Sequence, residues 1–217
     1  MKIVVLAGGL STERDVSLTS GAGICRTLLE NGHQAVLMDA FMGIPYDADK
    51  LEDLFSLPDA GLSIASGISA DEPDLAAIRA SRADQSPCLL GPNVIALCQM
   101  ADIVFMGLHG DIGENGKLQA TFDVLGIKYT GPNSLGSALA MDKGLTKQIF
   151  RTEGVPTPKG TWLYKSCQDT SLTALGLSLP VVVKPCSGGS SVGVYIVHTE
   201  EEYNQACLLY TSDAADD

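Results

Sequence analysis

The stretch Lys2-Ile-Val-Val-Leu-Ala-Gly-Gly-Leu-Ser-Thr-Glu-Arg14 decides the fold class of this chain. Its apolar run, residues 2–7, predicts a buried strand, and a Gly-rich turn follows it. Residues 16–30 then predict a helix that ends at Gly32, since glycine is favoured just past a helix C-terminus. Residues 34–39 predict a second strand. Strand, turn, helix and strand in this order form the βαβ unit that opens a doubly wound parallel sheet of the α/β class.

The turn after the first predicted strand excludes two kinds of nucleotide site. Its sequence, Gly8-Gly-Leu-Ser-Thr-Glu13, matches neither the G-x-G-x-x-G fingerprint nor the P-loop pattern. We therefore expect neither a dinucleotide site nor a P-loop phosphate site here. A nicotinamide-dependent oxidoreductase is excluded on the same ground.

Two polar residues follow the ends of strands in this first part of the chain. Glu13 comes shortly after the strand at residues 2–7, and His109 comes directly after a predicted strand at residues 102–108. Ligands of open α/β sheets collect beyond the carboxyl ends of the strands, so we expect these two side chains to share a site. The remaining predicted elements are helices at 48–55, 74–82, 93–100 and 117–125 and a short strand at 127–130.

The segment between residues 40 and 101 has weak hydrophobic periodicity. We interpret it as an insertion or an elaborated crossover, and it carries no chemistry that the residues identify. A turn at Gly131-Pro132-Asn133 indicates a domain boundary, so a first domain spans residues 1–136. A long helix is predicted at 137–152, followed by strands at 161–164, 181–184 and 192–197.

The loop between the last two predicted strands has the composition of a phosphate-binding loop. Ser187-Gly-Gly-Ser-Ser191 has little side-chain bulk, so its backbone N–H groups can approach a ligand closely. Lys184, at the end of the entering strand, supplies a point positive charge. A polyphosphate ligand would suit this set. The alternative, a flexible hairpin tip beside a surface lysine, stays open on these residues alone.

Charge and composition exclude several classes of partner. The chain has 217 residues, 14 basic and 26 acidic, and a net charge of −12. This balance argues against a nucleic acid or an anionic membrane as the principal partner, although a phosphate ligand needs only a local basic pocket. No apolar run reaches transmembrane length, and residues 1–3 lead directly into a strand and not into a signal peptide.

The cysteines and histidines indicate no metal site. Six cysteines are scattered without a C-x-x-C pair, which is typical of reduced thiols in a cytoplasmic protein. The three histidines lack metal-ligand spacing, so zinc is not indicated. Cys186, next to the Gly/Ser loop, is either a reactive thiol or a small space-filling residue.

Four segments that occur in order resemble one family, the D-alanine–D-alanine ligases of the ATP-grasp superfamily. The segments are Gly8-Gly-Leu-Ser-Thr-Glu-Arg-Asp-Val-Ser-Leu18; His109-Gly-Asp-Ile-Gly-Glu-Asn-Gly116; Tyr129-Thr-Gly131 with Ala138-Leu-Ala-Met-Asp-Lys143; and Val183-Lys184-Pro185 with Gly189-Ser-Ser-Val-Gly193. Each motif is modest by itself, whereas the ordered set is specific. The resemblance covers nearly all of residues 1–206.

The resemblance implies a fold in two parts. Residues 1–136 would form an N-terminal Rossmann-like, substrate-binding domain with the insertion at about 40–101. Residues 137–206 would form the first, incomplete part of an ATP-grasp domain, its small subdomain. Residues 207–217 do not resemble the family, and we interpret them as a foreign tail on a truncated fragment.

The resemblance also implies the chemistry. ATP phosphorylates the carboxylate of one D-alanine, and the amine of a second attacks the acyl phosphate to give the dipeptide used in bacterial peptidoglycan and cell-wall synthesis. The implied cofactors are ATP and Mg²⁺, with Mn²⁺ as a substitute. The metal ligands of the family lie beyond residue 217, so no metal-binding residue is expected in this chain and the fragment by itself is expected to be inactive. A cytoplasmic homodimer is the implied state of the complete protein.

Roles for individual residues follow from the same motifs. Glu13 matches the glutamate that anchors the ammonium of the first D-alanine, and His109 matches the histidine beside the reacting carboxylate. Lys143 and Lys184 match the two lysines that contact ATP phosphates. Ser190 matches a serine that orients the substrate-side glutamate. Gly189 and Ser191 match residues of a lid over the phosphates. Glu114 matches a structural carboxylate beside the loop that contains His109, called the histidine loop below.

Each of these residues also has an ordinary structural explanation. Glu13 could favour a helix N-terminus by its charge alone, His109 could be a turn histidine, and Lys143 could be a solvated surface lysine. Their joint occurrence favours the ligase. Two other functions stay open: a D-alanine–D-lactate ligase, because the loop that would select the nucleophile is absent, and a non-catalytic nucleotide-binding module.

Overall fold

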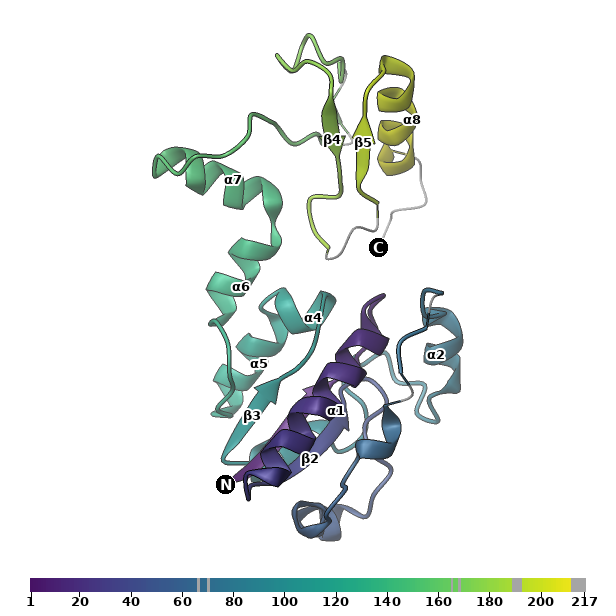
Figure 1. Ribbon diagram of the computed structural model, residues 1–217, viewed down its shortest axis with the longest axis vertical. Coiled ribbons are helices and arrows are strands. Elements are labelled where there is room, and N and C mark those ends of the chain that lie inside the picture. The colour runs from purple at the N-terminus through teal and green to yellow at the C-terminus, as the bar shows by residue number, and fades with distance from the viewer. Residues whose placement is uncertain (66, 70, 165, 168, 189–192, 212–217) are drawn as a thin grey trace. The chain divides into compact units, whose positions relative to one another are not determined.

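The computed structural model describes residues 1–217 except 66, 70, 165, 168, 189–192 and 212–217 (Figure 1). The chain divides into two compact units, Met1–Ala138 and Leu139–Asp217. None of the helices formed by the described residues combines the length and the apolar character needed to cross a membrane.

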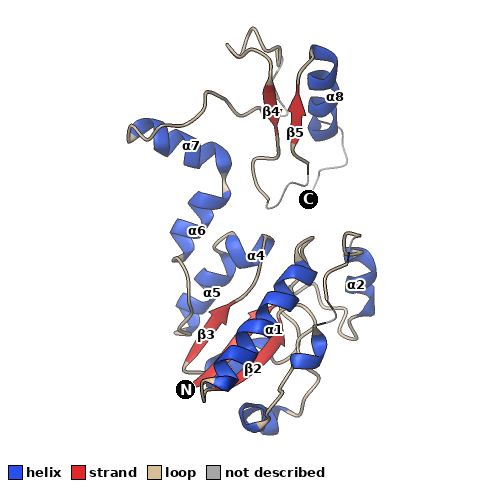
Figure 2. Ribbon diagram, in the orientation of Figure 1, coloured by secondary structure: helices blue, strands red, loops and turns tan. Residues whose placement is uncertain are grey.

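A parallel three-stranded sheet forms the centre of the first unit. Its strands are β1 (Lys2–Ala7), β2 (Gln34–Asp39) and β3 (Ile103–Met106), in the order β2-β1-β3 (Figure 2). Val4 of β1 pairs with Val36 of β2 and with Val104 of β3. The central first strand with crossovers to both sides confirms the α/β class predicted from the opening stretch.

Side chains of β1 alternate between two cores, as the period of two in a strand requires. Ile3, Val5 and Ala7 face the helix α1 (Arg14–Glu30), which lies across one face of the sheet (Figure 1). Val4 and Leu6 face a second core on the opposite side. Because both faces of the strand are covered, its sequence is apolar throughout and does not alternate.

The connection from β2 to β3 supplies much of the second core. It contains two 3₁₀ helices, η1 (Ala48–Ser56) and η2 (Leu62–Ile64), and two α-helices, α2 (Leu75–Ser81) and α3 (Val94–Met100). The predicted helix at 48–55 is therefore of the 3₁₀ type. The connection contributes five of the large buried side chains that pack on Val4 and Leu6, namely Leu51, Leu54, Phe55, Val94 and Leu97.

Several predicted boundaries in the first unit were wrong. Helix α1 begins at Arg14, two residues earlier than predicted, and β3 is shorter than the predicted strand at 102–108. The predicted strand at 127–130 reduces to one parallel bridge between Val104 and Tyr129. The predicted helix at 117–125 is α5 (Lys117–Leu125), and a short helix that was not predicted, α4 (Asp111–Glu114), precedes it.

The predicted long helix at 137–152 is two helices. These are α6 (Ser134–Met141) and α7 (Lys143–Thr152), and Asp142 separates them. Asp142 has an extended backbone conformation, and its Oδ1 accepts a hydrogen bond of 2.9 Å from the Leu145 N–H. A side chain that caps the start of a new helix in this way ends the preceding one, which is why the helical pattern does not run through.

An antiparallel strand pair and one helix form the ordered centre of the second unit. Strands β4 (Val181–Val183) and β5 (Tyr195–Val197) pair with Val181 opposite Val197. Helix α8 (Glu200–Thr211) continues well past residue 206, where the predicted helix ended. A small core joins Leu172, Val197 and Tyr203. The predicted strand at 161–164 does not form, and Val192 of the predicted strand at 192–197 lies outside the described residues.

Candidate functional site

Ser17 fixes the ends of two neighbouring strands of the first unit. Its hydroxyl accepts a 2.8 Å hydrogen bond from the N–H of Gly8, just past β1, and donates a 2.7 Å bond to the carbonyl of Gly107, just past β3. The serine is completely buried on α1. One side chain of α1 thereby satisfies a backbone N–H just past β1 and a backbone carbonyl just past β3. This holds the turn after β1 against the segment after β3.

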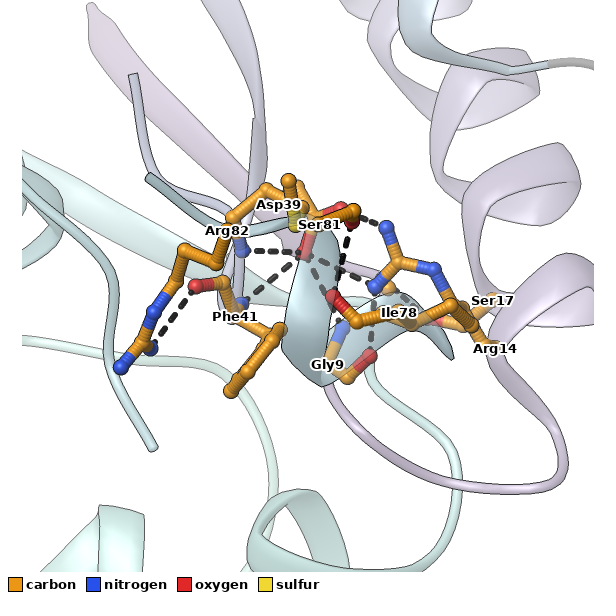
Figure 3. A network of polar contacts seen from close by, with 10 residues as sticks. Gly9, Arg14, Ser17, Asp39, Phe41, Ile78, Ser81 and Arg82 are labelled. Carbon is orange, nitrogen blue, oxygen red and sulfur yellow. Dashed lines mark hydrogen bonds and ion pairs between the residues drawn. The ribbon is translucent and has the colours of Figure 1, made fainter. Parts of the chain in front are cut away.

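A buried ion pair supports the same turn from the other side. Arg14 and Asp39 form a salt bridge in which both side chains are almost completely buried. The Arg14 guanidinium also donates to the Gly9 carbonyl at 2.5 Å, and Asp39 Oδ1 accepts from the N–H groups of Gly9 and Phe41 at 3.3 and 2.9 Å. Figure 3 shows these groups gathered around the Asp39 carboxylate.

Sequence reasoning missed this pair. Asp39 is a charged residue at the end of an otherwise apolar strand, and Arg14 is the first residue of the helix that covers the sheet. A charge in each of those positions is a signal for a buried pair, because an isolated charge is rarely buried without a partner. Nothing in the sequence joins the two residues, which lie 25 positions apart.

The segments that carry Glu13 and His109 meet beyond the ends of β1 and β3. Ser11 Oγ donates a 2.9 Å hydrogen bond to the His109 carbonyl. Gly110 has a positive φ of 67°, and a Cβ atom at this position would lie 3.0 Å from the Glu13 carboxylate oxygen Oε2. The Glu13 carboxylate therefore lies against the backbone that follows His109, as the strand-end argument predicts.

The Glu13 carboxylate makes no hydrogen bond or ion pair with any residue in the described part of the chain. It stands at the position preceding α1, yet it makes no side-chain capping bond there. The residue is half-buried. A capping role through hydrogen bonding is thus not realised, and the carboxylate remains available to a positively charged ligand. The imidazole of His109 is also half-buried and contacts Ser20, with 3.3 Å between Nε2 and the serine Oγ.

Glu114 follows His109 closely in the chain but is more exposed than Glu13 and His109. It is the last residue of α4, and its side chain is exposed. Nearby, Gln119 of α5 donates a 2.7 Å hydrogen bond to the Gly113 carbonyl and so holds the end of the histidine loop. Gln119 is buried, and sequence reasoning did not single it out.

In the second unit, Lys143 is attached to the loop that follows β4. It is the first residue of α7; its N–H donates to the Cys186 carbonyl at 3.0 Å and its Nζ to the Gly188 carbonyl at 2.6 Å. Lys184 follows β4 directly and is exposed. Gly189, Ser190 and Ser191, which the family resemblance places in the same loop, lie outside the described residues.

A further lysine adds to the positive charge of this unit. Lys147 lies one turn after Lys143 on α7 and is half-buried. Burial and then the charges of Arg151 and Lys184 lower the pKa of Lys147 from its usual value. Lys147 and Lys184 are therefore close enough to repel one another. Sequence reasoning did not single out Lys147. Its spacing of four from Lys143, which puts both lysines on one helix face, could have identified it.

Cys186 is a neutral thiol in this environment. Its Sγ–H donates to Asp142 Oδ1 at 3.1 Å. Burial and then this hydrogen bond to a carboxylate raise the pKa of the Cys186 thiol. Because the thiolate is the nucleophilic form, this environment argues against a reactive cysteine. Cys186 is exposed, so it does not fill buried space either.

The chain matches two family models that together span most of its length. Residues 2–132 match the model described as D-ala D-ala ligase N-terminus, and residues 150–214 match the model described as D-ala D-ala ligase C-terminus. The second match runs into the segment 207–217.

Individual relatives agree with these matches. The chain is 46% identical over 204 residues to the D-alanine–D-alanine ligase of Lacticaseibacillus casei, which covers 93% of the chain and 56% of that relative. The match to the crystal structure of the Bacillus anthracis D-alanine–D-alanine ligase covers 97% of this chain and 54% of the ligase chain. The sequence identity is 30% and the TM-score is 0.64. The match to the structure of the same enzyme complexed with ATP covers 97% of this chain and 52% of the ligase chain. The sequence identity is 28% and the TM-score is 0.63. The chain thus spans about half the length of the relatives it matches.

Proposed function

We infer, because the chain belongs to the D-alanine–D-alanine ligase family, that it is part of an enzyme that joins two D-alanines at the expense of ATP. The proposed reaction has two steps. ATP first phosphorylates the carboxylate of one D-alanine, and the amine of a second D-alanine then attacks the acyl phosphate and displaces phosphate. The product is D-alanyl-D-alanine for peptidoglycan synthesis.

The observation that carries this proposal is the carboxylate of Glu13, which lies beside the backbone of Gly110 and has no partner among the residues that the structure describes. A half-buried carboxylate without a partner favours a cationic ligand, and the ammonium of the first D-alanine is such a ligand. His109 precedes Gly110 directly, and in this proposal its ring lies beside the same small zwitterion. There the ring would help to orient this small zwitterion for the reaction.

The lysines of the second unit support the proposed ATP site. Lys143 and Lys184 would contact the phosphates, with Lys147 adding positive charge nearby. A point charge on a flexible stem suits a phosphate ligand. The relative from Bacillus anthracis has been crystallised with ATP. For Gly189, Ser190 and Ser191 the proposed lid and orienting roles rest on the family motif alone, as does the structural role of Glu114.

The described residues do not fit the magnesium ions that the family implies. Among them, no three His, Cys, Asp or Glu side chains come together as a metal site would require. We therefore assign no step of the reaction to a metal held by these residues. We propose, on the family resemblance, that the 217 residues alone do not turn over and that the reaction of the complete protein uses Mg²⁺ or Mn²⁺.

Two alternatives differ from this proposal in defined ways. A D-alanine–D-lactate ligase would use the same Glu13 and His109 but a hydroxyl nucleophile. A non-catalytic nucleotide-binding module would need the lysines and not the unpaired Glu13 carboxylate, so the geometry around Glu13 favours the ligase.

The proposal is tested with this chain and with a version extended by the C-terminal part of the Lacticaseibacillus casei ligase. Both are given ATP, Mg²⁺ and either D-alanine alone or D-alanine with D-lactate, and the products are separated by mass. We expect D-alanyl-D-alanine from the extended chain only. A depsipeptide product would favour the lactate ligase. ATP binding without any product from the extended chain would contradict the proposed function and favour the nucleotide-binding module.

The family resemblance supports a cytoplasmic homodimer that associates through the N-terminal unit. The mass of the extended protein in solution, measured by light scattering, checks this part of the proposal. We expect twice the mass of one chain, and a single-chain mass at micromolar concentration would contradict it.

A further inference from the structure

Two serines on one face of α1 contact the segment that follows β3. Ser17 and Ser20 are three positions apart, which places them on the same side of the helix. Ser17 donates to the Gly107 carbonyl, and Ser20 lies 3.3 Å from the Nε2 atom of His109. The helix therefore contacts the backbone of this segment through one hydroxyl and the His109 ring through the other.

The backbone of α1 offers an acceptor to the hydroxyl proton of Ser20. Ser20 Oγ donates to the backbone carbonyl of Ser17 at 3.2 Å. A serine hydroxyl has one proton and two acceptor lone pairs. When its proton is directed to the Ser17 carbonyl, Ser20 accepts from the imidazole, and in this arrangement Nε2 of His109 carries the proton.

The other ring nitrogen of His109 is left for a ligand. No described residue forms a hydrogen bond with Nδ1. The bond made by one imidazole nitrogen decides which nitrogen carries the proton and how the ring is oriented. The His109 main chain is held as well, because Ser11 donates to its carbonyl at 2.9 Å. The residue is thus fixed at both its backbone and its ring.

We propose that Ser20 is a positioning residue that holds the His109 ring in the tautomer protonated on Nε2 and so leaves Nδ1 to face the substrate. The first part stands on the contacts of Ser20 alone. The second part rests on the proposed function, since it takes His109 to lie beside the reacting carboxylate.

The test uses ¹⁵N-labelled 217-residue chain at pH above about 8, where an ordinary histidine is neutral. The side-chain nitrogens of the three histidines are recorded by NMR, and H109N identifies the signals of His109. We expect the wild-type ring to be protonated on Nε2. In S20A the fraction protonated on Nδ1 should rise about fivefold, the ratio that corresponds to the loss of one ordinary hydrogen bond.

Two further variants make the result specific. S20T keeps a hydroxyl and should restore the wild-type tautomer. T27A is the matched control, because Thr27 also donates to a carbonyl of α1, that of Gly23 at 3.0 Å, but lies on an exposed part of the helix. T27A should leave His109 unchanged. A wild-type ring protonated on Nδ1, or a tautomer ratio that S20A does not alter, would overturn the proposal.

Activity of the extended chain separates this inference from the proposed function. We expect S20A to lower kcat on the order of tenfold, as for a misplaced reacting group, with the KM for ATP within about twofold of wild type. A changed tautomer with unchanged kcat would support the positioning by Ser20 and contradict the role proposed for His109 in the ligase reaction.

Discussion

Lys147 and Lys184 repel one another in a chain whose net charge is −12. In the described part of the chain neither ammonium group has a hydrogen bond or ion pair, whereas Lys159 donates to the Gly176 carbonyl and Lys143 to the Gly188 carbonyl. An unpaired pair of cations costs free energy until an anion binds between or beside them. At the scale of residues, this repulsion supports the proposal that a polyanion such as ATP binds in the second unit.

Removal of either proposed phosphate lysine should weaken nucleotide binding. We expect K184A and K143A in the extended chain each to raise the dissociation constant for ATP about 5- to 100-fold, since each removes a charged contact worth roughly 1 to 3 kcal/mol. Calorimetric titration at constant ionic strength measures the effect. K159A is the matched control and should bind ATP as wild type does. Unchanged ATP affinity in both variants would refute the assignment.

At the scale of elements, α1 must pack closely on the sheet to bring Ser17 and Ser20 to the strand ends. Gly21 faces the sheet, and a Cβ atom there would lie 2.7 Å from the Cβ of Ala7 and 3.1 Å from Leu37 Cδ1. Two residues later on the same helix, a Cβ atom at Gly23 would meet nothing within 4 Å. Glycine is thus required by packing at one position and by nothing in the structure at the other.

This contrast predicts opposite effects of the same substitution. G21A should destabilise the protein by about 1 to 3 kcal/mol, because the added methyl group forces the helix from the sheet. G23A should stabilise it by about 0.5 to 1 kcal/mol through the lower conformational freedom of alanine in the unfolded chain. Urea unfolding followed by circular dichroism measures both. A stabilising G21A would show that α1 does not pack as described.

The start of α7 should respond to pH through Asp142. The N–H of Leu145 and then the Cys186 thiol, both donating to this carboxylate, lower its pKa below the usual range. A lowered folded-state pKa means that the charged form stabilises the fold above the unfolded-state pKa of about 3.9. That contribution disappears as the pH falls through the folded-state value.

D142A should therefore cost about 1 kcal/mol of stability at pH 6, the usual effect of losing a helix N-cap. The difference in stability between D142A and wild type should shrink as the pH falls from about 4 toward 2. The shift in the urea midpoint at each pH measures this difference. D142N is the control, because asparagine also caps helices without a charge and should retain most of the stability at pH 6. A D142A deficit that is constant down to pH 2 would contradict the capping role.

The parts of the fold that could be predicted from sequence are those with local signals. β1, β2 and α5 were predicted with their observed ends, because apolar runs and flanking glycines mark them. The division of the predicted helix at 137–152 was missed, because Asp142 is compatible with a helix until its capping bond is seen. The predicted strand at 127–130 was wrong in extent, because in this segment only Tyr129 pairs with the sheet, through a single bridge.

The candidate site could be predicted as far as strand topology brings residues together. Glu13 and His109 were placed in one site because both follow strand ends of one parallel sheet. The contacts that build the site could not be predicted. The Arg14–Asp39 pair and the Ser20–His109 contact join residues 25 and 89 positions apart, and no sequence pattern reports such pairings.

At the scale of the whole molecule, the two units differ in how much core they contain. The first unit has two hydrophobic cores that cover both faces of its sheet. The second has one small core around Leu172, Val197 and Tyr203, and Val182 and Ile196 on the other face of its strand pair are exposed. Burial of apolar area is the main favourable term in folding, so the first unit should be the more stable of the two.

Native-state hydrogen exchange checks this difference. The amides of Val4 and Leu6 in β1 should exchange at least 100-fold more slowly than that of Val182 in β4, because opening free energies that differ by roughly 3 kcal/mol give that ratio. Equal protection in β1 and β4 would show that the whole chain unfolds as one cooperative unit.

In the proposed function, the segments after β1 and β3 form a D-alanine site within the first unit. Titration of the ¹⁵N-labelled 217-residue chain with D-alanine, followed by NMR, tests it without ATP or metal. We predict saturable shifts of the amides from Gly9 to Glu13 and at His109 and Gly110, weaker shifts with L-alanine, and loss of the response in E13Q. No shift at these amides, or equal responses to the two enantiomers, would contradict the account.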